Sequence, residues 1–265
     1  MNPSAPDLKI PERKLAEALP DFHICPACRE IVRFPFVRRY ADLNIDVIWL
    51  LCECGTLFQA HGQDEFPAQD RVKLYQDWSE DPVWFNDRST FLKRIYVPLM
   101  EDMQPGRKFL EYRYAHHVSL DWMRERGWLP YGVDECEAAL PGDHQHQSCD
   151  FMDMALIEPW RKFNLIWLTD CIQKYEHPFP VLAKAYSMLE KHGLMFVSAP
   201  DTDFIHRLGP KFFGHFDPSA NRLMMRGESF ARLAERVGFN TIFLRKSDSR
   251  AGLVNDQFHW IGQRK

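Results

Sequence analysis

The chain has 265 residues, of which 45% are hydrophobic, so it can bury the core of one α/β domain with a small additional module. Its formal net charge is −4, and without an overall basic field there is no reason to expect nucleic-acid binding. The sequence contains no apolar run long enough to cross a bilayer and no signal peptide at its N-terminus, so we expect a cytoplasmic protein with no membrane span.

Residues 21–62 contain two cysteine pairs separated by two runs of β-forming residues. The pairs are Cys25 and Cys28 in the sequence CPAC, and Cys52 and Cys54 in the sequence CECG. Hairpin strands with a cysteine pair at each end predict a zinc ribbon, because four thiolates form a closed tetrahedral site for structural zinc. Metal binding would also supply folding free energy to a segment too short to bury a sufficient core. The C-x-C spacing of the second pair leaves open whether His23 or His61 replaces one thiolate.

The segments on either side of this module are expected to be simpler. Residues 1–20 are polar and contain several prolines, which predicts a flexible N-terminal tail. Residues 63–104 are expected to form a helical connector. Apolar residues between Arg88 and Asp102 recur at helical spacing, and Pro98 is expected to kink or shorten this helix.

From residue 105 to residue 265, segments typical of strands alternate with segments typical of helices. This alternation predicts an α/β domain with a doubly wound, mostly parallel seven-stranded sheet. The run FNLIWLT is continuously apolar, as in a strand that is buried on both faces. The expected strands are residues 108–112, 129–133, 148–151, 163–169, 194–198, 240–245 and 257–262, and the expected helices are 118–126, 179–190 and 227–237.

The order of these segments resembles that of the class I S-adenosylmethionine-dependent methyltransferases of the small-molecule type. The family's first motif corresponds to KFLEYRYAHH, the end of its second strand to YGVDECEA, and its fourth-strand motif to FNLIWLTDCIQKYEHP. The later elements correspond to VLAKAYSMLEKHGLMFVSAPDTD and RGESFARLAERVGF, and some relatives also carry an N-terminal four-cysteine zinc module. The resemblance implies a Rossmann-like methyltransferase fold and S-adenosylmethionine as the cofactor.

The resemblance also implies roles for three acidic residues. Asp134, at the end of the second strand, would accept hydrogen bonds from the ribose hydroxyls of the cofactor. Glu111 occupies the acidic position of the first motif, near the amino-acid end of the cofactor, although it could instead pair with Arg113 or a nearby lysine. Asp153, or alternatively Asp150, lies where the family contacts the adenine.

Several positions depart from the family pattern. Bulky side chains replace the glycines of the first motif and would fill the space of the cofactor's methionine and ribose. The acid–histidine pair after the fourth strand is missing, which leaves Asp170, His177 and His215 as candidates to assist proton removal. The departures are Arg113, Ala115 and His117 in the first motif, Gln173 and Lys174 after the fourth strand, and Asn164 near its start.

These observations leave three functions open. The first is transfer of a methyl group from S-adenosylmethionine to a small or carrier-linked metabolite. The second is a catalytically inactive methyltransferase-like protein that serves as a protein-binding, regulatory or assembly module. The third is an altered enzyme that uses the histidines of the changed turn, His116 and His117, with His144 and His146 as further metal ligands. The expected partner is accordingly a small-molecule substrate or another protein.

Overall fold

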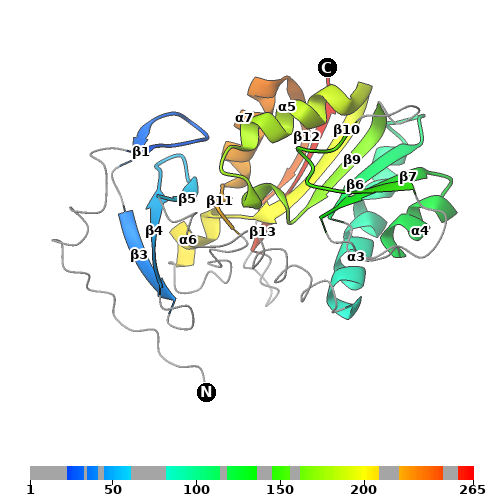
Figure 1. Cartoon of the computed structure of the whole chain (residues 1–265). Coiled ribbons are helices and arrows are strands. Elements are labelled where there is room, and N and C mark those ends of the chain that lie inside the picture. The colour runs from blue at the N-terminus through cyan, green and yellow to red at the C-terminus, as the bar shows by residue number, and fades with distance from the viewer. Residues whose placement is uncertain are drawn as a thin grey trace.

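The structure is a computed structural model that describes residues 23–32, 35–40, 45–60, 82–113, 118–135, 145–155, 162–208, 221–246 and 256–265. The described residues form three sheets, of seven, four and two strands (Figure 1). In this part of the chain, no helix is both long and apolar enough to cross a membrane. Of the features singled out in the sequence, the tail 1–20, His61, the turn 114–117, His144 and His215 lie outside the described residues.

The central sheet is doubly wound and mostly parallel, as the sequence predicts. Its strands are β6 (Lys108–Tyr112), β7 (Leu129–Asp134), β8 (Gln145–Ser148), β9 (Phe163–Thr169), β10 (Leu189–Pro200), β12 (Phe239–Arg245) and β13 (Gln257–Arg264). Their order is β12-β13-β10-β9-β6-β7-β8, with only β13 antiparallel to both of its neighbours. The chain leaves β6 toward β7 and later resumes on its other side with β9. The topological switch point, where ligands bind in such sheets, therefore lies between β6 and β9.

Helices cover both faces of this sheet (Figure 1). One face carries α5 (Pro178–Met188) and α7 (Gly227–Val237), and the other carries α3 (Pro82–Glu101) and α4 (Val118–Glu125). The buried face of α3 includes Tyr96 and Val97, which pack with Trp167 and Phe196 of the sheet. Two short helices follow strands at the carboxyl edge of the sheet. They are η3 (Ile172–Lys174) after β9 and α6 (Asp203–Leu208) after β10.

Some element boundaries differ from those expected. α3 continues to Glu101, so the expectation that Pro98 shortens the helix is wrong. In the last turn a proline removes only one backbone hydrogen bond, and the burial of Val97 and Met100 holds that turn against the sheet. β10 begins at Leu189 rather than at residue 194, because Leu189 pairs with Phe163 ahead of a register shift.

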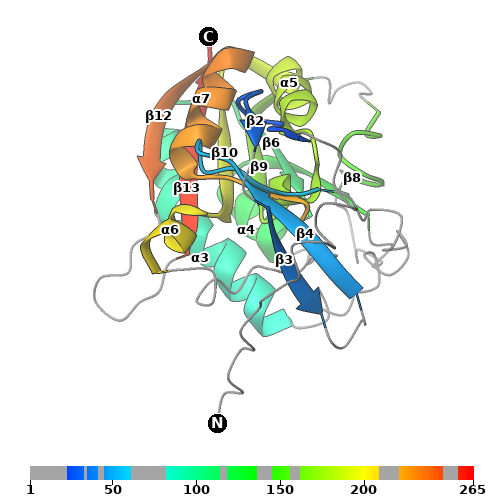
Figure 2. The ribbon, with the colours of Figure 1, turned by 90° about the vertical axis from the view of Figure 1, so that its left-hand side faces the viewer.

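A four-stranded sheet joins the N-terminal cysteine segment to the rest of the molecule. We call β1 to β5 the cysteine module, and Figure 2 shows its β3–β4 hairpin in front of the central sheet. The strands are β1 (His23–Ile24), β2 (Ile31–Val32), β3 (Pro35–Tyr40), β4 (Ile45–Leu51) and β5 (Leu57–Gln59), and the fourth strand of the larger sheet is β11 (Leu223–Met224). β11 comes from the C-terminal part of the chain and pairs antiparallel with β5. The module is thus continuous with the α/β domain through a shared sheet.

Candidate functional site

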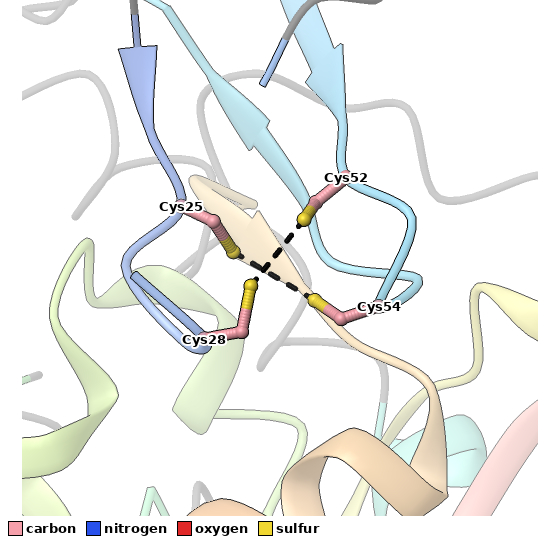
Figure 3. A group of neighbouring side chains, drawn as sticks. All are labelled: Cys25, Cys28, Cys52 and Cys54. Carbon is pink, nitrogen blue, oxygen red and sulfur yellow. Dashed lines mark hydrogen bonds between the residues drawn. The ribbon is translucent and has the colours of Figure 1, made fainter. Parts of the chain in front are cut away.

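The four cysteines of the module converge on one point (Figure 3). Their sulfur atoms all lie within 4.8 Å of one another. The Sγ atoms of Cys25 and Cys54 are 3.7 Å apart, and those of Cys28 and Cys52 are 3.5 Å apart. Four thiolates bound tetrahedrally to zinc at about 2.3 Å would have sulfurs roughly 3.8 Å apart. The donor set and its spacing therefore fit a closed Zn²⁺ site, and His23 and His61 are not needed as ligands.

Hydrogen bonds within the cluster distribute its protons unevenly. The pKa of the Cys54 thiol is lowered to about 4, first because Cys25 donates a hydrogen bond to it and also because Thr56 does. The pKa of Cys25 is raised, mainly by the same hydrogen bond and by burial. Burial also raises the pKa of Cys52 to about 12. Cys54 thus gathers negative charge while Cys25 and Cys52 hold protons, and a divalent cation would replace those protons.

The second cysteine turn is tied to the α/β domain through its backbone. The carbonyl of Cys54 accepts a hydrogen bond from the Ser229 hydroxyl of α7, and the carbonyl of Gly55 accepts one from Thr202. Gly55 has a φ of 86°, and an added Cβ would lie 2.3 Å from the Arg226 side chain. Only glycine meets both conditions without displacing its neighbours. The position of the cysteine turn therefore depends on the segment that follows β10.

A second group of polar side chains meets at the carboxyl edge of the central sheet. We call Tyr112, Glu135, Asp150, Lys174 and Tyr175 the carboxyl-edge cluster. Tyr112 ends β6, Glu135 follows β7, Asp150 lies shortly after β8, and Lys174 and Tyr175 follow β9 across the switch point. Strand order alone brings them together, because the carboxyl ends of parallel strands share one edge of a sheet.

Lys174 lies at the centre of this cluster. Its Nζ is 2.7 Å from Asp150 Oδ2 and also donates hydrogen bonds to Glu135 Oε1 and to the Tyr112 hydroxyl. The same Nζ lies 4.6 Å from the ring centroid of Tyr112 and 4.8 Å from that of Tyr175. Burial and the nearby carboxylate of Asp150 raise the pKa of Tyr175, so it remains a phenol that donates to Asp150 Oδ1 at 3.0 Å.

Two of the three acids predicted to bind the cofactor lie close to this cluster in the chain. Asp134 ends β7 directly before Glu135, as expected, and is buried. Asp153 is exposed in the turn after β8, and its backbone NH bonds the carbonyl of Asp150 at 3.0 Å. Asp150, the alternative considered for adenine binding, is the acid of this turn that joins the cluster. The cofactor-binding roles of Asp134 and Asp153 stay predictions.

The third acid, Glu111, faces the α3 side of the sheet. Its Oε1 is 2.6 Å from Nζ of Lys93, and its Oε2 accepts a hydrogen bond from Ser119 at 2.5 Å. Pairing with a nearby lysine, the alternative weighed for Glu111, is confirmed. The Lys93 side chain is 0% exposed, and burial lowers its pKa against the opposing effect of Glu111. The cofactor-binding role of Glu111 stays a prediction.

The candidate proton acceptors occupy different places. Asp170 follows β9 with a φ of 50°, and its carboxylate accepts a hydrogen bond from the Gln257 side chain. Ser198 donates to the same Gln257 side chain at 2.7 Å, so Asp170 belongs to a polar network at the carboxyl ends of β9 and β10. His177 is exposed at the start of α5. Of the histidines proposed as metal ligands, His146 is described, and it is exposed in β8.

Several departures from the family pattern have structural counterparts. Arg113 adopts a φ of 57°, the left-handed conformation that glycine adopts most easily. The side-chain oxygen of Asn164 accepts a hydrogen bond from the Lys108 backbone NH at 3.0 Å and so links β9 to β6.

Sequence reasoning missed Tyr112, Glu135 and Tyr175 as site residues. For Tyr112 and Glu135 the signal was position alone, since each lies at or just beyond the carboxyl end of a predicted strand, whereas Tyr175 follows η3, which the sequence did not predict.

Comparison with known proteins agrees with this architecture. A family model described as a methyltransferase domain matches residues 84–243. The 1,6-didemethyltoxoflavin-N1-methyltransferase of Burkholderia thailandensis, solved with 1,6-didemethyltoxoflavin and S-adenosylhomocysteine, is 16% identical with a TM-score of 0.54, covering 88% of this chain and 100% of its own. A SAM-dependent methyltransferase from Archaeoglobus fulgidus is 13% identical with a TM-score of 0.51, covering 68% and 98%.

A third similar structure comes from a Haloferax volcanii complex between the Trm112 methyltransferase activator and a methyltransferase. It is 11% identical with a TM-score of 0.51, covering 71% of this chain and 96% of that one. At these identities, the likeness to all three structures concerns the fold. No curated protein matches the sequence.

Proposed function

This chain belongs to the methyltransferase-domain family, and we propose that it binds S-adenosylmethionine at the carboxyl edge of β6 and β7 and transfers the methyl group to a small or carrier-linked metabolite. The observation that carries the proposal is the meeting of acidic side chains at the switch point of the sheet. Glu135 follows β7 and Asp150 follows β8, and both carboxylates bond Lys174. Asp134 ends β7 directly before Glu135, and Tyr112 ends β6, which lies between β7 and β9. Doubly wound sheets bind nucleotide-containing cofactors at this place.

Each of these residues has a role in the proposed site. The carboxylates of Asp134 and Glu135 would accept hydrogen bonds from the ribose hydroxyls, and Asp150, with Asp153 further out, would lie nearer the base. The ring of Phe151 is 5.5 Å from that of Tyr112 and is fully buried, which gives the edge a rigid apolar floor. The similar Burkholderia enzyme was solved with S-adenosylhomocysteine, which supports this choice of cofactor.

S-adenosylmethionine, when bound, supplies an electrophilic methyl group on its sulfonium. The chain's own contribution would be alignment of the acceptor with that methyl group and exclusion of water. Asp170 is fixed by Gln257 at the end of β9, so its carboxylate is suited to take the proton that the acceptor loses on methylation. His177 and His215 remain alternatives for this step.

We also propose one zinc ion per chain, held by Cys25, Cys28, Cys52 and Cys54. The sulfur spacing and the donor chemistry support it. Its role would be structural, because four thiolates leave no coordination position for a substrate or water.

Substitution of the strand-end acids tests cofactor binding. In calorimetric titrations with S-adenosylhomocysteine, we expect Glu135→Gln and Asp134→Asn to weaken binding by about ten- to a hundredfold each, since each removes a charged hydrogen-bond acceptor. Asp153→Asn tests the predicted contact of that residue with the adenine. Asp102→Asn serves as the control, because Asp102 is an exposed residue outside the site. No heat from folded wild-type protein at millimolar ligand would contradict the proposal.

A catalytically inactive protein-binding module is the second candidate. It is favoured by Lys174, whose ammonium already engages Glu135 and Asp150, and by Arg113 at a position where the family has glycine. One similar structure joins a methyltransferase to an activator protein, so a protein partner is a reasonable expectation here. In that case Asp134→Ala would leave the biological function intact, whereas loss of function in a folded variant would rule out this candidate.

A further inference from the structure

The ammonium of Lys174 fills the acidic end of the proposed cofactor site. We propose that Lys174 is an internal cation that closes this site, so that a ligand binds only after displacing its side chain. The inference rests on the proposed function for the identity of the ligand. The position of Lys174 itself rests on contacts with three strand ends.

The contacts are those of a cation-binding cage. Two carboxylates, Glu135 and Asp150, bond the ammonium directly, and the rings of Tyr112 and Tyr175 lie within cation–π distance of it. The side chain of Lys174 is only 15% exposed, although those of Glu135 and Asp150 are 26% and 27% exposed. A carboxylate that holds the ammonium has fewer lone pairs for ribose hydroxyls, so lysine and cofactor compete for the same acceptors.

Hydrogen bonds and an ion pair fix the backbone on either side of Lys174. The carbonyl of Gln173 accepts a hydrogen bond from the Arg222 backbone NH at 2.8 Å, and the Arg222 guanidinium lies 3.1 Å from Glu176. Lysine carries its charge on a flexible four-carbon stem. Displacement therefore requires rotation of the side chain and leaves η3 in place.

This arrangement lowers the apparent affinity for the cofactor, because only the fraction of molecules in which the site is open can bind it. If one molecule in ten is open, ligand binding is about tenfold weaker than to a permanently open site. Lys174 would then set the cofactor concentration at which the protein becomes occupied.

The test compares Lys174→Met with Lys174→Arg and with Lys191→Met, which alters an exposed lysine of β10. In titrations with S-adenosylhomocysteine, we expect Lys174→Met to bind at least about tenfold more tightly than wild type. Lys174→Arg, which keeps the charge, and the Lys191→Met control should bind no more tightly than wild type. Equal or weaker binding by Lys174→Met, with an unchanged melting temperature, would overturn the inference.

A second measurement does not depend on ligand binding. Acetylation of lysines followed by mass spectrometry should modify Lys174 at least about fivefold more slowly than Lys191 in the ligand-free protein, because its ammonium is bonded and covered. The double variant Glu135→Gln/Asp150→Asn should remove this protection. Equal rates for Lys174 and Lys191 in wild type would overturn the inference. Protection of Lys174 without ligand binding by any variant would support the closed cage and contradict the proposed cofactor.

Discussion

Cys54→Ser is expected to release the metal and to unfold the cysteine module. Structural zinc contributes on the order of 10 kcal/mol to the folding of small zinc-binding peptides. Loss of even about 4 kcal/mol would lower the melting temperature of a domain of this size by roughly 10 °C. The effect should extend to β11, because the carbonyl of Cys54 is bonded to Ser229 and β5 is paired with β11.

Metal analysis and thermal melting check this result together. We expect about one zinc per chain in wild type and much less in Cys54→Ser, and a strong chelator should reproduce the loss of stability in wild type. Cys149→Ser is the matched control, since Cys149 lies near Gln147 and outside the sulfur cluster. A Cys54→Ser protein with full zinc content and an unchanged melting temperature would refute the tetrahedral site.

The second large effect is expected at the buried ion pair of Lys93 and Glu111. Glu111→Gln should lower the free energy of unfolding by about 3–5 kcal/mol, because it leaves the ammonium of Lys93 buried without its charged partner. Lys93 is 0% exposed and Glu111 is 2% exposed, so water cannot replace the lost carboxylate. The double variant Lys93→Met/Glu111→Leu should recover much of this loss, since an apolar pair of similar volume needs no compensation.

Denaturant unfolding measures both values, and an exposed ion pair supplies the control. Lys246 and Glu228 are 51% and 48% exposed, so Glu228→Gln should change stability by less than about 1 kcal/mol. A similarly small change for Glu111→Gln would show that the buried pair contributes little to folding.

The pair also predicts a dependence on pH. Burial lowers the pKa of Lys93 from its ordinary value of 10.5, and Glu111→Gln removes the group that opposes this shift. Between the folded pKa and 10.5, the unfolded chain binds more protons than the folded one, so stability rises with pH. The deficit of Glu111→Gln relative to wild type should therefore shrink between pH 7 and about pH 10. A deficit that is constant over this range would contradict the assignment of the cost to the Lys93 ammonium.

The parts of the fold that sequence predicted are those with strong local signals. The apolar run of β9 is buried on both faces, as FNLIWLT indicated. The spacing of the paired cysteines also predicted that they would cluster, because two short turns are enough to bring four sulfur atoms together. The order of strands and helices then identified the doubly wound sheet.

The parts that sequence missed depend on contacts between distant residues. β11 has two residues and no periodic pattern, so its pairing with β5 could not be read locally. Lys93 on a helix would ordinarily be assigned to a solvated face, and only the packing of α3 against β6 buries it beside Glu111. The contact of Lys174 with Glu135 likewise follows from strand order, which places residues after β7 and β9 on either side of β6.

The shared sheet also has a consequence for synthesis on the ribosome. Gln59 and Asn221, which are joined by a hydrogen bond beside the β5–β11 pair, are 162 residues apart in the chain. At about 5–20 residues per second, translation needs on the order of ten seconds to cover that distance. During this interval the edge of β5 has no β11 to pair with, and open strand edges favour association between chains. Cys25 and Cys54, by contrast, are only 29 residues apart. A metal ion bound by the cysteines can therefore stabilise the nascent module long before β11, the fourth strand of its sheet, is synthesised.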